Sequence, residues 1–143
     1  MSRTIHILCC VLCLGCCGLA QESSASHCQG STVADYSAEL TPKAKAFLAE
    51  LKTAVQAVDK RKVGAMVKYP LRVNTGEGHK TIQSATKFVA EYDRLLPASV
   101  RKAITAQAPE CLFANWQGVM IGNGEVWFSE QRDGSMKIHA LNP

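Results

Sequence analysis

Hydrophobic and polar positions change their period along this chain. From residue 47 to residue 58 apolar residues recur every three or four positions, as on one side of a helix. From Asn115 to Pro143 they alternate with a period of two, and Asn123-Gly124 and Asp133-Gly134 each lie between apolar runs. Such dipeptides favour tight hairpin turns because glycine and asparagine accept positive φ angles. The C-terminal stretch therefore predicts a three-stranded antiparallel meander.

The two turns also predict which residues lie opposite each other. With two-residue loops, Met120 lies opposite Trp127, and Trp127 lies opposite Ala140. One face of the meander is free of charge and holds both tryptophans, so we expect it to be the interior face. It carries Trp116, Gly118, Met120, Trp127, Ser129, Met136, Ile138 and Ala140. The other face is mixed and is expected to be wetter, with Gln117, Val119, Ile121, Val126, Phe128, Glu130, Lys137, His139 and Leu141.

Helices and one hairpin are predicted before the meander. Thr41 is expected to cap a first amphipathic helix, and a second short helix is expected to end before Tyr69-Pro70. Residues 71–73 and 80–82 predict a hairpin, Ser84 is expected to cap a third helix, and a fourth runs from Pro97 towards Pro109. This order predicts an α+β domain, with helices packed on the concave side of a curved antiparallel sheet.

The first residues have the pattern of a secretory signal peptide. Arg3 precedes an apolar run over residues 5–14, and small residues end the segment at Ala20. We therefore expect residues 1–20 to be removed on export and the protein to be periplasmic or secreted. Leu14-Gly15-Cys16-Cys17 also resembles a bacterial lipobox, so a lipoprotein attached to the membrane through Cys17 is the alternative. Residues 21–40 are predicted to be a flexible tail before a domain at 41–143.

Cysteine usage and charge narrow the function classes. Of seven cysteines, only Cys28 and Cys111 lie outside the predicted leader. In an oxidising compartment they would form one disulfide; the alternative is a buried free thiol at Cys111. No ligand spacing for zinc occurs, so neither a metal nor another cofactor is predicted. The net charge of the chain is +4, and loss of Arg3 with the leader would lower it further. This charge is too small to predict a nucleic-acid-binding surface.

From about Thr41 to its end, the chain resembles the nuclear transport factor 2-like (NTF2-like, SnoaL-like) superfamily, and within it secreted bacterial members. Three segments carry the resemblance: 69–73 (Tyr-Pro-Leu-Arg-Val), 88–93 (Phe-Val-Ala-Glu-Tyr-Asp) and 118–128 (Gly-Val-Met-Ile-Gly-Asn-Gly-Glu-Val-Trp-Phe). The resemblance implies a cone-shaped sheet with a pocket between its concave face and the helices. It does not imply one chemistry, since the superfamily includes isomerases, dehydratases, epoxide hydrolases and transport adaptors.

The candidate ligand-binding residues follow from this expected pocket. Trp116, Met120 and Trp127 would form its walls, and Tyr69, Arg72, His79 and Tyr92 would lie near its mouth. The alternative is that both tryptophans are core residues. Catalytic members of the superfamily use a carboxylate or an Asp–His pair inside the cone, and the predicted interior strand face has neither. Asp93 and His79 are therefore only weak catalytic candidates.

Three functions remain open from the sequence. The first is an exported, non-catalytic binding domain for a small molecule or a cell-envelope glycan or peptide. The second is a small isomerase- or dehydratase-type enzyme that uses Asp93 or His79. The third is a protein-interaction module that forms a homodimer through the outer face of the sheet, where Val119, Ile121, Val126 and Phe128 are expected.

Overall fold

A computed structural model describes Cys28 and residues 30–143. Within them the chain forms one six-stranded sheet, six α-helices and one 3₁₀ turn, which together make an α+β domain. The expected leader at residues 1–20 and the expected lipidation of Cys17 lie outside the described residues. No helix in the described part is both long and apolar enough to cross a bilayer.

The segment expected to be a flexible tail carries a helix. α1 (Val33–Tyr36) starts at Thr32, whose backbone N–H and hydroxyl both donate to the Asp35 carboxylate, at 2.7 and 2.9 Å. Val33 is fully buried, and its N–H donates to the carbonyl oxygen of Leu112 at 2.6 Å. Part of the segment expected to be a flexible tail is therefore packed against the rest of the chain.

The long helix α2 (Leu40–Gln56) starts earlier than predicted. Its N-cap position is Glu39 and not Thr41, whose hydroxyl instead donates to the backbone oxygen of Ser37 at 2.7 Å. The Ser37 hydroxyl accepts the Leu40 N–H at 3.2 Å, and it supplies the capping contact expected of Thr41. The predicted apolar stripe is confirmed for Phe47, Leu48, Leu51 and Val55, which are buried, but not for Val58, which lies beyond the helix and is 56% exposed.

The middle of the chain is more segmented than predicted. α3 (Lys60–Ala65) ends before Met66, and the next residues already form strand β1. The single helix expected after Ser84 is two short helices, α4 (Ala85–Ala90) and α5 (Tyr92–Leu95), with Glu91 between them. Ser84 does cap α4, because its hydroxyl accepts the Lys87 N–H at 3.3 Å. α6 (Ala98–Ala106) follows Pro97 as predicted, and the 3₁₀ turn η1 (Pro109–Cys111) follows it.

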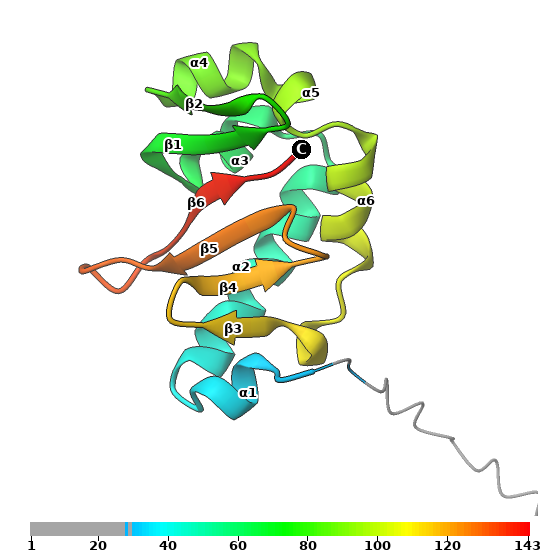
Figure 1. Ribbon diagram of the computed structural model, residues 1–143, viewed down its shortest axis with the longest axis vertical. Coiled ribbons are helices and arrows are strands. Elements are labelled where there is room, and N and C mark those ends of the chain that lie inside the picture. The colour runs from blue at the N-terminus through cyan, green and yellow to red at the C-terminus, as the bar shows by residue number, and fades with distance from the viewer. Residues whose placement is uncertain (1–27, 29) are drawn as a thin grey trace, which may run out of the picture.

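The sheet is mixed, where an antiparallel sheet was predicted. Its strand order is β2-β1-β6-β5-β4-β3, and β1 runs parallel to β6, whereas the other neighbours are antiparallel. β1 (Val67–Thr75) and β2 (Gly78–Ile82) are the predicted hairpin with longer strands. The meander gains a fourth strand, so that it comprises β3 (Phe113–Asn115), β4 (Gly118–Ile121), β5 (Val126–Glu130) and β6 (Met136–Leu141). Figure 1 shows α2 behind β3 to β6 and α6 beside these strands at the right, with no described helix in front of them.

Only the first of the two predicted turns has the expected two-residue loop. The Asn123-Gly124 register is confirmed, with Met120 opposite Trp127 and Val119 opposite Phe128. Around Asp133-Gly134, the Gly134 N–H donates to the oxygen of Gln131 at 2.9 Å and Gly134 has a φ of +80°. This is a type I turn followed by a left-handed glycine, a three-residue loop that shifts the pairing by one residue. Glu130 thus lies opposite Met136, not Lys137.

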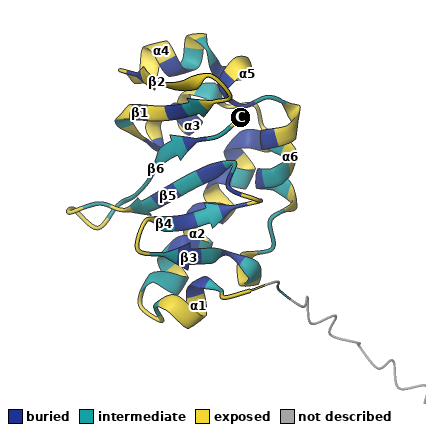
Figure 2. Ribbon diagram, viewed as in Figure 1, coloured by how far each residue is buried: buried dark blue, intermediate teal, exposed yellow. Residues whose placement is uncertain are grey.

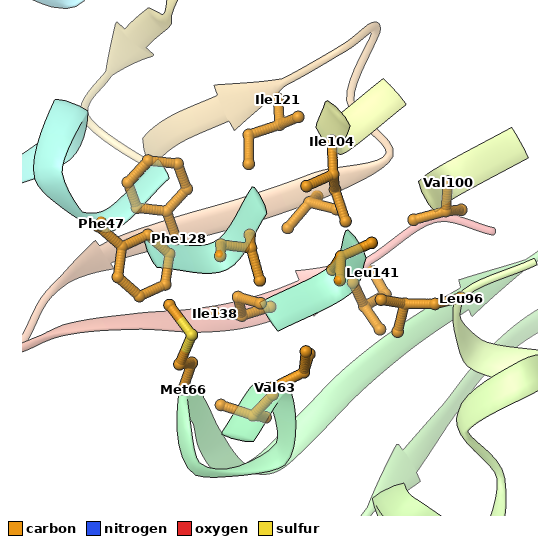
Figure 3. Close-up of a cluster of buried hydrophobic side chains, with 14 of the residues drawn as sticks. Phe47, Val63, Met66, Leu96, Val100, Ile104, Ile121, Phe128, Ile138 and Leu141 are labelled. Carbon is orange, nitrogen blue, oxygen red and sulfur yellow. The ribbon is translucent and has the colours of Figure 1, made fainter. Parts of the chain in front are cut away.

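The predicted assignment of the two faces is wrong. The residues that face the helices are the ones expected to be wet: Val119, Ile121, Val126, Phe128 and Leu141 are all fully buried. In Figure 3, Phe128 stacks on Phe47 of α2, and the ring centroids are 4.7 Å apart. Met120 and Trp127 are only partly buried and Trp116 is exposed. Figure 2 shows this alternation of buried and partly buried positions along β4 and β5.

The three-residue loop explains why one predicted interior residue, Ile138, is nevertheless buried, and a bulge in β6 then restores the predicted pairing farther along the strand. Trp127 lies opposite Ala140 as predicted, but Phe128 lies opposite Ile138, so His139 is an extra residue in its strand. Ile138 and Leu141 consequently share the helix-covered face, although they are three residues apart. His139 and Ala140 are left on the other side of the sheet. We call that side the open face; it carries Phe113, Met120, Trp127, His139, Ala140, Arg72 and Asn74.

Candidate functional site

A hollow of about 470 Å³ lies on the open face, over β1, β5 and β6. We call it the Trp127 hollow; its lining residues are Arg72, Asn74, Gln117, Trp127, His139, Ala140 and Asn142. Its volume falls in the range of small-molecule sites. None of these lining residues is acidic, so the hollow has a positive and amide-rich wall.

Strand register explains how this hollow is assembled from distant parts of the sequence. Arg72 lies opposite Ala140, and Ala140 lies opposite Trp127, which places all three in one row across β1, β6 and β5. The row continues through Met120 and Phe113, so its other end is apolar. The rings of Phe113 and Trp127 meet edge to face with centroids 6.4 Å apart, which fixes the indole plane.

The Arg72 side chain is oriented by a chain of hydrogen bonds. Its Nε donates to Asn74 Oδ1 at 2.7 Å, and Asn74 Nδ2 donates to Asn142 Oδ1 at 2.7 Å. Asn142 Nδ2 in turn donates to the carbonyl oxygen of Gly124. Within the described part of the chain, Arg72 forms no ion pair with a carboxylate. The two terminal nitrogens of the guanidinium are thus available for an acidic ligand, in the planar geometry that binds carboxylates bidentately.

His139 forms part of the floor of the hollow. Its Nε2 atom is buried and has no hydrogen-bond partner among the described residues. A Cβ added to Gly118 would lie 3.2 Å from this nitrogen, which shows how closely the ring covers the β4 backbone. Burial lowers the pKa of His139 below its usual 6.5, and the charge of Lys68 lowers it further, whereas a hydrogen bond with the Gln117 backbone opposes both. The imidazole is therefore neutral at pH 7.

The two tyrosines predicted at the pocket mouth do not reach the Trp127 hollow. Tyr69 donates its hydroxyl to the Gly64 oxygen at 2.9 Å, and burial raises its pKa to about 12. Tyr92 is fully buried; its ring meets Phe88 edge to face, and Lys60 Nζ lies 5.3 Å from its centroid. Burial raises the pKa of Tyr92 as well. Both side chains are parts of the packed interior in this structure.

The predicted wall residues are divided between two places. Met120 lies beside Trp127 on the open face, near the turn at Gly124. Trp116 projects from the turn between β3 and β4 and is 84% exposed. It lines a separate hollow with Tyr36 of α1. The structure therefore brings Trp127 and Arg72 together, sets Met120 beside them, and leaves Trp116 apart.

Both weak catalytic candidates are exposed on the surface. Asp93, at the start of α5, has a largely exposed side chain that pairs with Lys60 at 2.7 Å and Arg101 at 3.6 Å. The hydrogen bond from Lys60 lowers the pKa of Asp93, and Arg101 acts in the same direction. His79 is exposed on β2 and lines a different hollow with Lys80 and Arg94. Neither Asp93 nor His79 lines the Trp127 hollow.

Cys28 and Cys111 are joined by a disulfide in the structure, with Cα atoms 5.1 Å apart. The bond ties the start of the described chain to η1, across a separation of 83 residues. The described residues contain no group of three histidine, cysteine, aspartate or glutamate side chains that could hold a metal ion.

Sequence reasoning missed five residues of the Trp127 hollow as site residues: Asn74, Gln117, His139, Ala140 and Asn142. A two-residue period already places Arg72 and Asn74 on one face of their strand, so the alternation could have predicted that Asn74 lies beside Arg72 in the site. The contribution of Asn142 depends on the parallel pairing of β1 with β6, which no local pattern indicates.

Comparisons with protein-family models, curated proteins and solved structures found no match for this chain.

Proposed function

We propose that this chain is an exported, non-catalytic binding domain of the NTF2-like type, and that its site is the Trp127 hollow. The ligand we propose is a small molecule with an apolar ring and a carboxylate. Trp127 would contact the ring, and Arg72 would bind the carboxylate. The leader-like pattern of residues 1–20 supports export, and the order of helices and strands around a curved sheet supports the NTF2-like type.

One observation carries the proposal: an arginine held in place by asparagines, and without a carboxylate partner in the described chain, lies in the same hollow as a partly buried tryptophan. An oriented guanidinium loses little side-chain freedom when it binds, so it favours a planar anion over a hydroxyl group. The neighbouring amides of Asn74, Gln117 and Asn142 are the kind of polar groups that fix a ligand's orientation.

The location differs from the pocket that the resemblance implies. The space between the sheet and the helices is filled by buried apolar side chains such as Phe47, Phe128 and Ile121. An enzyme of the isomerase or dehydratase kind would need a carboxylate or a histidine inside the cone, but none is buried there in the described chain, and the ionisable group that is buried, the Tyr92 hydroxyl, has a pKa raised by burial. A binding function on the open face therefore agrees better with the packing than the isomerase or dehydratase alternative.

Fluorescence of Trp127 tests the proposal. In a Trp116→Phe background Trp127 is the only tryptophan, since the chain has two. Phenylacetate, 2-phenylethanol and phenethylamine share one ring and differ in charge. We expect phenylacetate to change the emission saturably and to bind at least about tenfold more tightly than the other two, because a charged hydrogen bond contributes about 1.5–3 kcal/mol.

Variants of Arg72 supply the matched controls. Arg72→Ala should abolish the preference for phenylacetate, and Arg72→Lys should restore only part of it, because lysine lacks the planar fork. Glu77→Ala, in the exposed β1–β2 turn and outside the hollow, should leave the affinity unchanged. Equal binding of the acid, the alcohol and the amine would contradict the proposal, as would an unchanged affinity in Arg72→Ala.

A further inference from the structure

A second hollow of about 470 Å³ lies between the start of α2 and the turn from β3 to β4. We call it the Trp116 hollow. Three large apolar or aromatic residues of the described chain are well exposed, and two of them, Trp116 at 84% and Tyr36 at 50%, line this hollow. Single exposed apolar residues are ordinary, but two aromatic rings on one hollow form a surface suited to a ligand.

Both rings stand on anchored parts of the backbone. α1, which carries Tyr36, is held by the buried side chain of Val33 and by the hydrogen bond from its N–H to Leu112. The turn that carries Trp116 is closed by Asn115, whose Oδ1 accepts the Gln117 N–H at 2.8 Å. Gly118 follows with a φ of +137°, and a Cβ there would lie 2.6 Å from the Phe128 carbonyl oxygen. The turn backbone is therefore fixed, and a ligand that binds there does not need to order it.

The charge of the Trp116 hollow is opposite to that of the Trp127 hollow. Glu39 and Glu130 line it, and no lysine, arginine or histidine does. Glu130 is paired with Lys43 at 2.5 Å, but Glu39 forms no ion pair within the described residues. Lys43 also interacts electrostatically with Glu39, so one lysine serves two carboxylates and the carboxylates of the hollow keep a net negative charge.

We infer that the Trp116 hollow binds an organic cation, such as a quaternary or primary alkylammonium group. Aromatic faces attract cations through their electron-rich centres, and tryptophan does so most strongly. The carboxylate of Glu39 would supply the counter-charge. A neutral sugar could also stack on Trp116, but it would gain nothing from the charge of Glu39, and so the charge of the hollow favours the cation.

The test compares choline with 3,3-dimethylbutan-1-ol, which has the same shape but carbon in place of the charged nitrogen. In a Trp127→Phe background Trp116 is the only tryptophan, so its emission reports this hollow alone. We expect choline to bind at least about tenfold more tightly than the uncharged alcohol. Glucose and cellobiose, titrated in parallel, should give no saturable change.

Four variants assign the contacts. Glu39→Gln should weaken choline binding about two- to fivefold, as expected for an exposed charge pair. Tyr36→Ala should weaken it by a similar factor, and Tyr36→Phe should restore it because the ring is retained. Trp116→Ala, followed through the backbone amide NMR signals of Asn115 and Gln117, should remove most of the binding while the melting temperature stays unchanged, since the side chain is 84% exposed.

Several results would overturn the inference. Equal binding of choline and its uncharged isostere would show that charge plays no part, and saturable binding of glucose or cellobiose without choline would make the hollow a sugar site. Absence of any saturable response to choline in both fluorescence and NMR would also overturn it. The Trp127 hollow is tested with a different tryptophan and a ligand of opposite charge, so failure of one proposal leaves the other standing.

Discussion

The two faces of the sheet are built from the same strands but have opposite characters. The helix-covered face is closed by apolar packing, in which residues such as Val119 and Phe128 have no exposed surface. The open face has a row that begins with Phe113 and ends with Arg72, and its polar groups are oriented by hydrogen bonds rather than by burial. The difference indicates that one face provides stability and the other is available for binding.

Substitution of the neighbouring aromatic residues Phe128 and Trp127 should show the largest difference in stability between the two faces. Phe128→Ala removes a fully buried ring that stacks on Phe47, so we expect a loss of about 3–5 kcal/mol in the free energy of unfolding. Trp127→Ala, one residue away on the open face, should cost only about 1–2 kcal/mol and should abolish phenylacetate binding. Urea unfolding of both variants measures this difference. A larger loss in Trp127→Ala than in Phe128→Ala would reverse our assignment of the faces.

The disulfide tests whether stability can be lowered without damage to the open face. Replacement of Cys28 and Cys111 by serine should lower the free energy of unfolding by about 2–4 kcal/mol, because a long loop is then no longer closed in the unfolded chain. Phenylacetate binding at the Trp127 hollow should be unchanged, since neither cysteine lines it. A non-reducing peptide map of the native protein should contain the two cysteines linked. Two freely alkylated thiols and an unchanged stability would refute the pairing.

The pH dependence should be smaller and should come from the open face. Because burial lowers the pKa of His139 in the folded protein, the unfolded chain binds a proton more tightly. Stability should therefore fall as the pH drops below about 6.5, by at most about 1.4 kcal/mol for each unit of the pKa difference. His139→Asn should show a shallower loss between pH 7.5 and pH 5, measured by chemical denaturation. Identical slopes for the two proteins would show that His139 does not titrate as described.

Local signals in the sequence predicted most of the elements but not which face they bury. Asn123-Gly124 sets a two-residue loop, so the pairing of Met120 with Trp127 followed from the dipeptide alone. Asp133-Gly134 fits a two- or a three-residue loop, and the structure has the three-residue loop. The bulge at His139 then reverses the alternation again. Neither event has a local signature, so alternation alone could not place Ile138.

Charge was a poor guide to burial in this meander. Both faces carry large apolar residues, and the sequence predicts the face without charge to be the interior because Glu130 and Lys137 are expected on the other face. In the structure Glu130 stays on the helix-covered face at the end of β5, where it pairs with Lys43 of α2. The shifted register sets Lys137 opposite Ser129, and its ammonium group donates to the Ala65 carbonyl oxygen. A charge at the end of a strand is therefore compatible with a buried middle of the same face. The Trp127 hollow was only partly predictable, because it depends on the parallel contact between β1 and β6.

The most direct test of the two-sided account uses the two indole N–H signals in a ¹H–¹⁵N correlation spectrum of the labelled protein. Phenylacetate should shift the Trp127 indole signal and leave that of Trp116 in place, and Arg72→Ala should remove the shift. Amides of Ile121, Val126 and Phe128, which face the helices, should move less than those of Arg72, His139 and Ala140. Shifts concentrated at the helix-facing residues, or a response of Trp116 alone, would contradict the claim that the open face is the binding face.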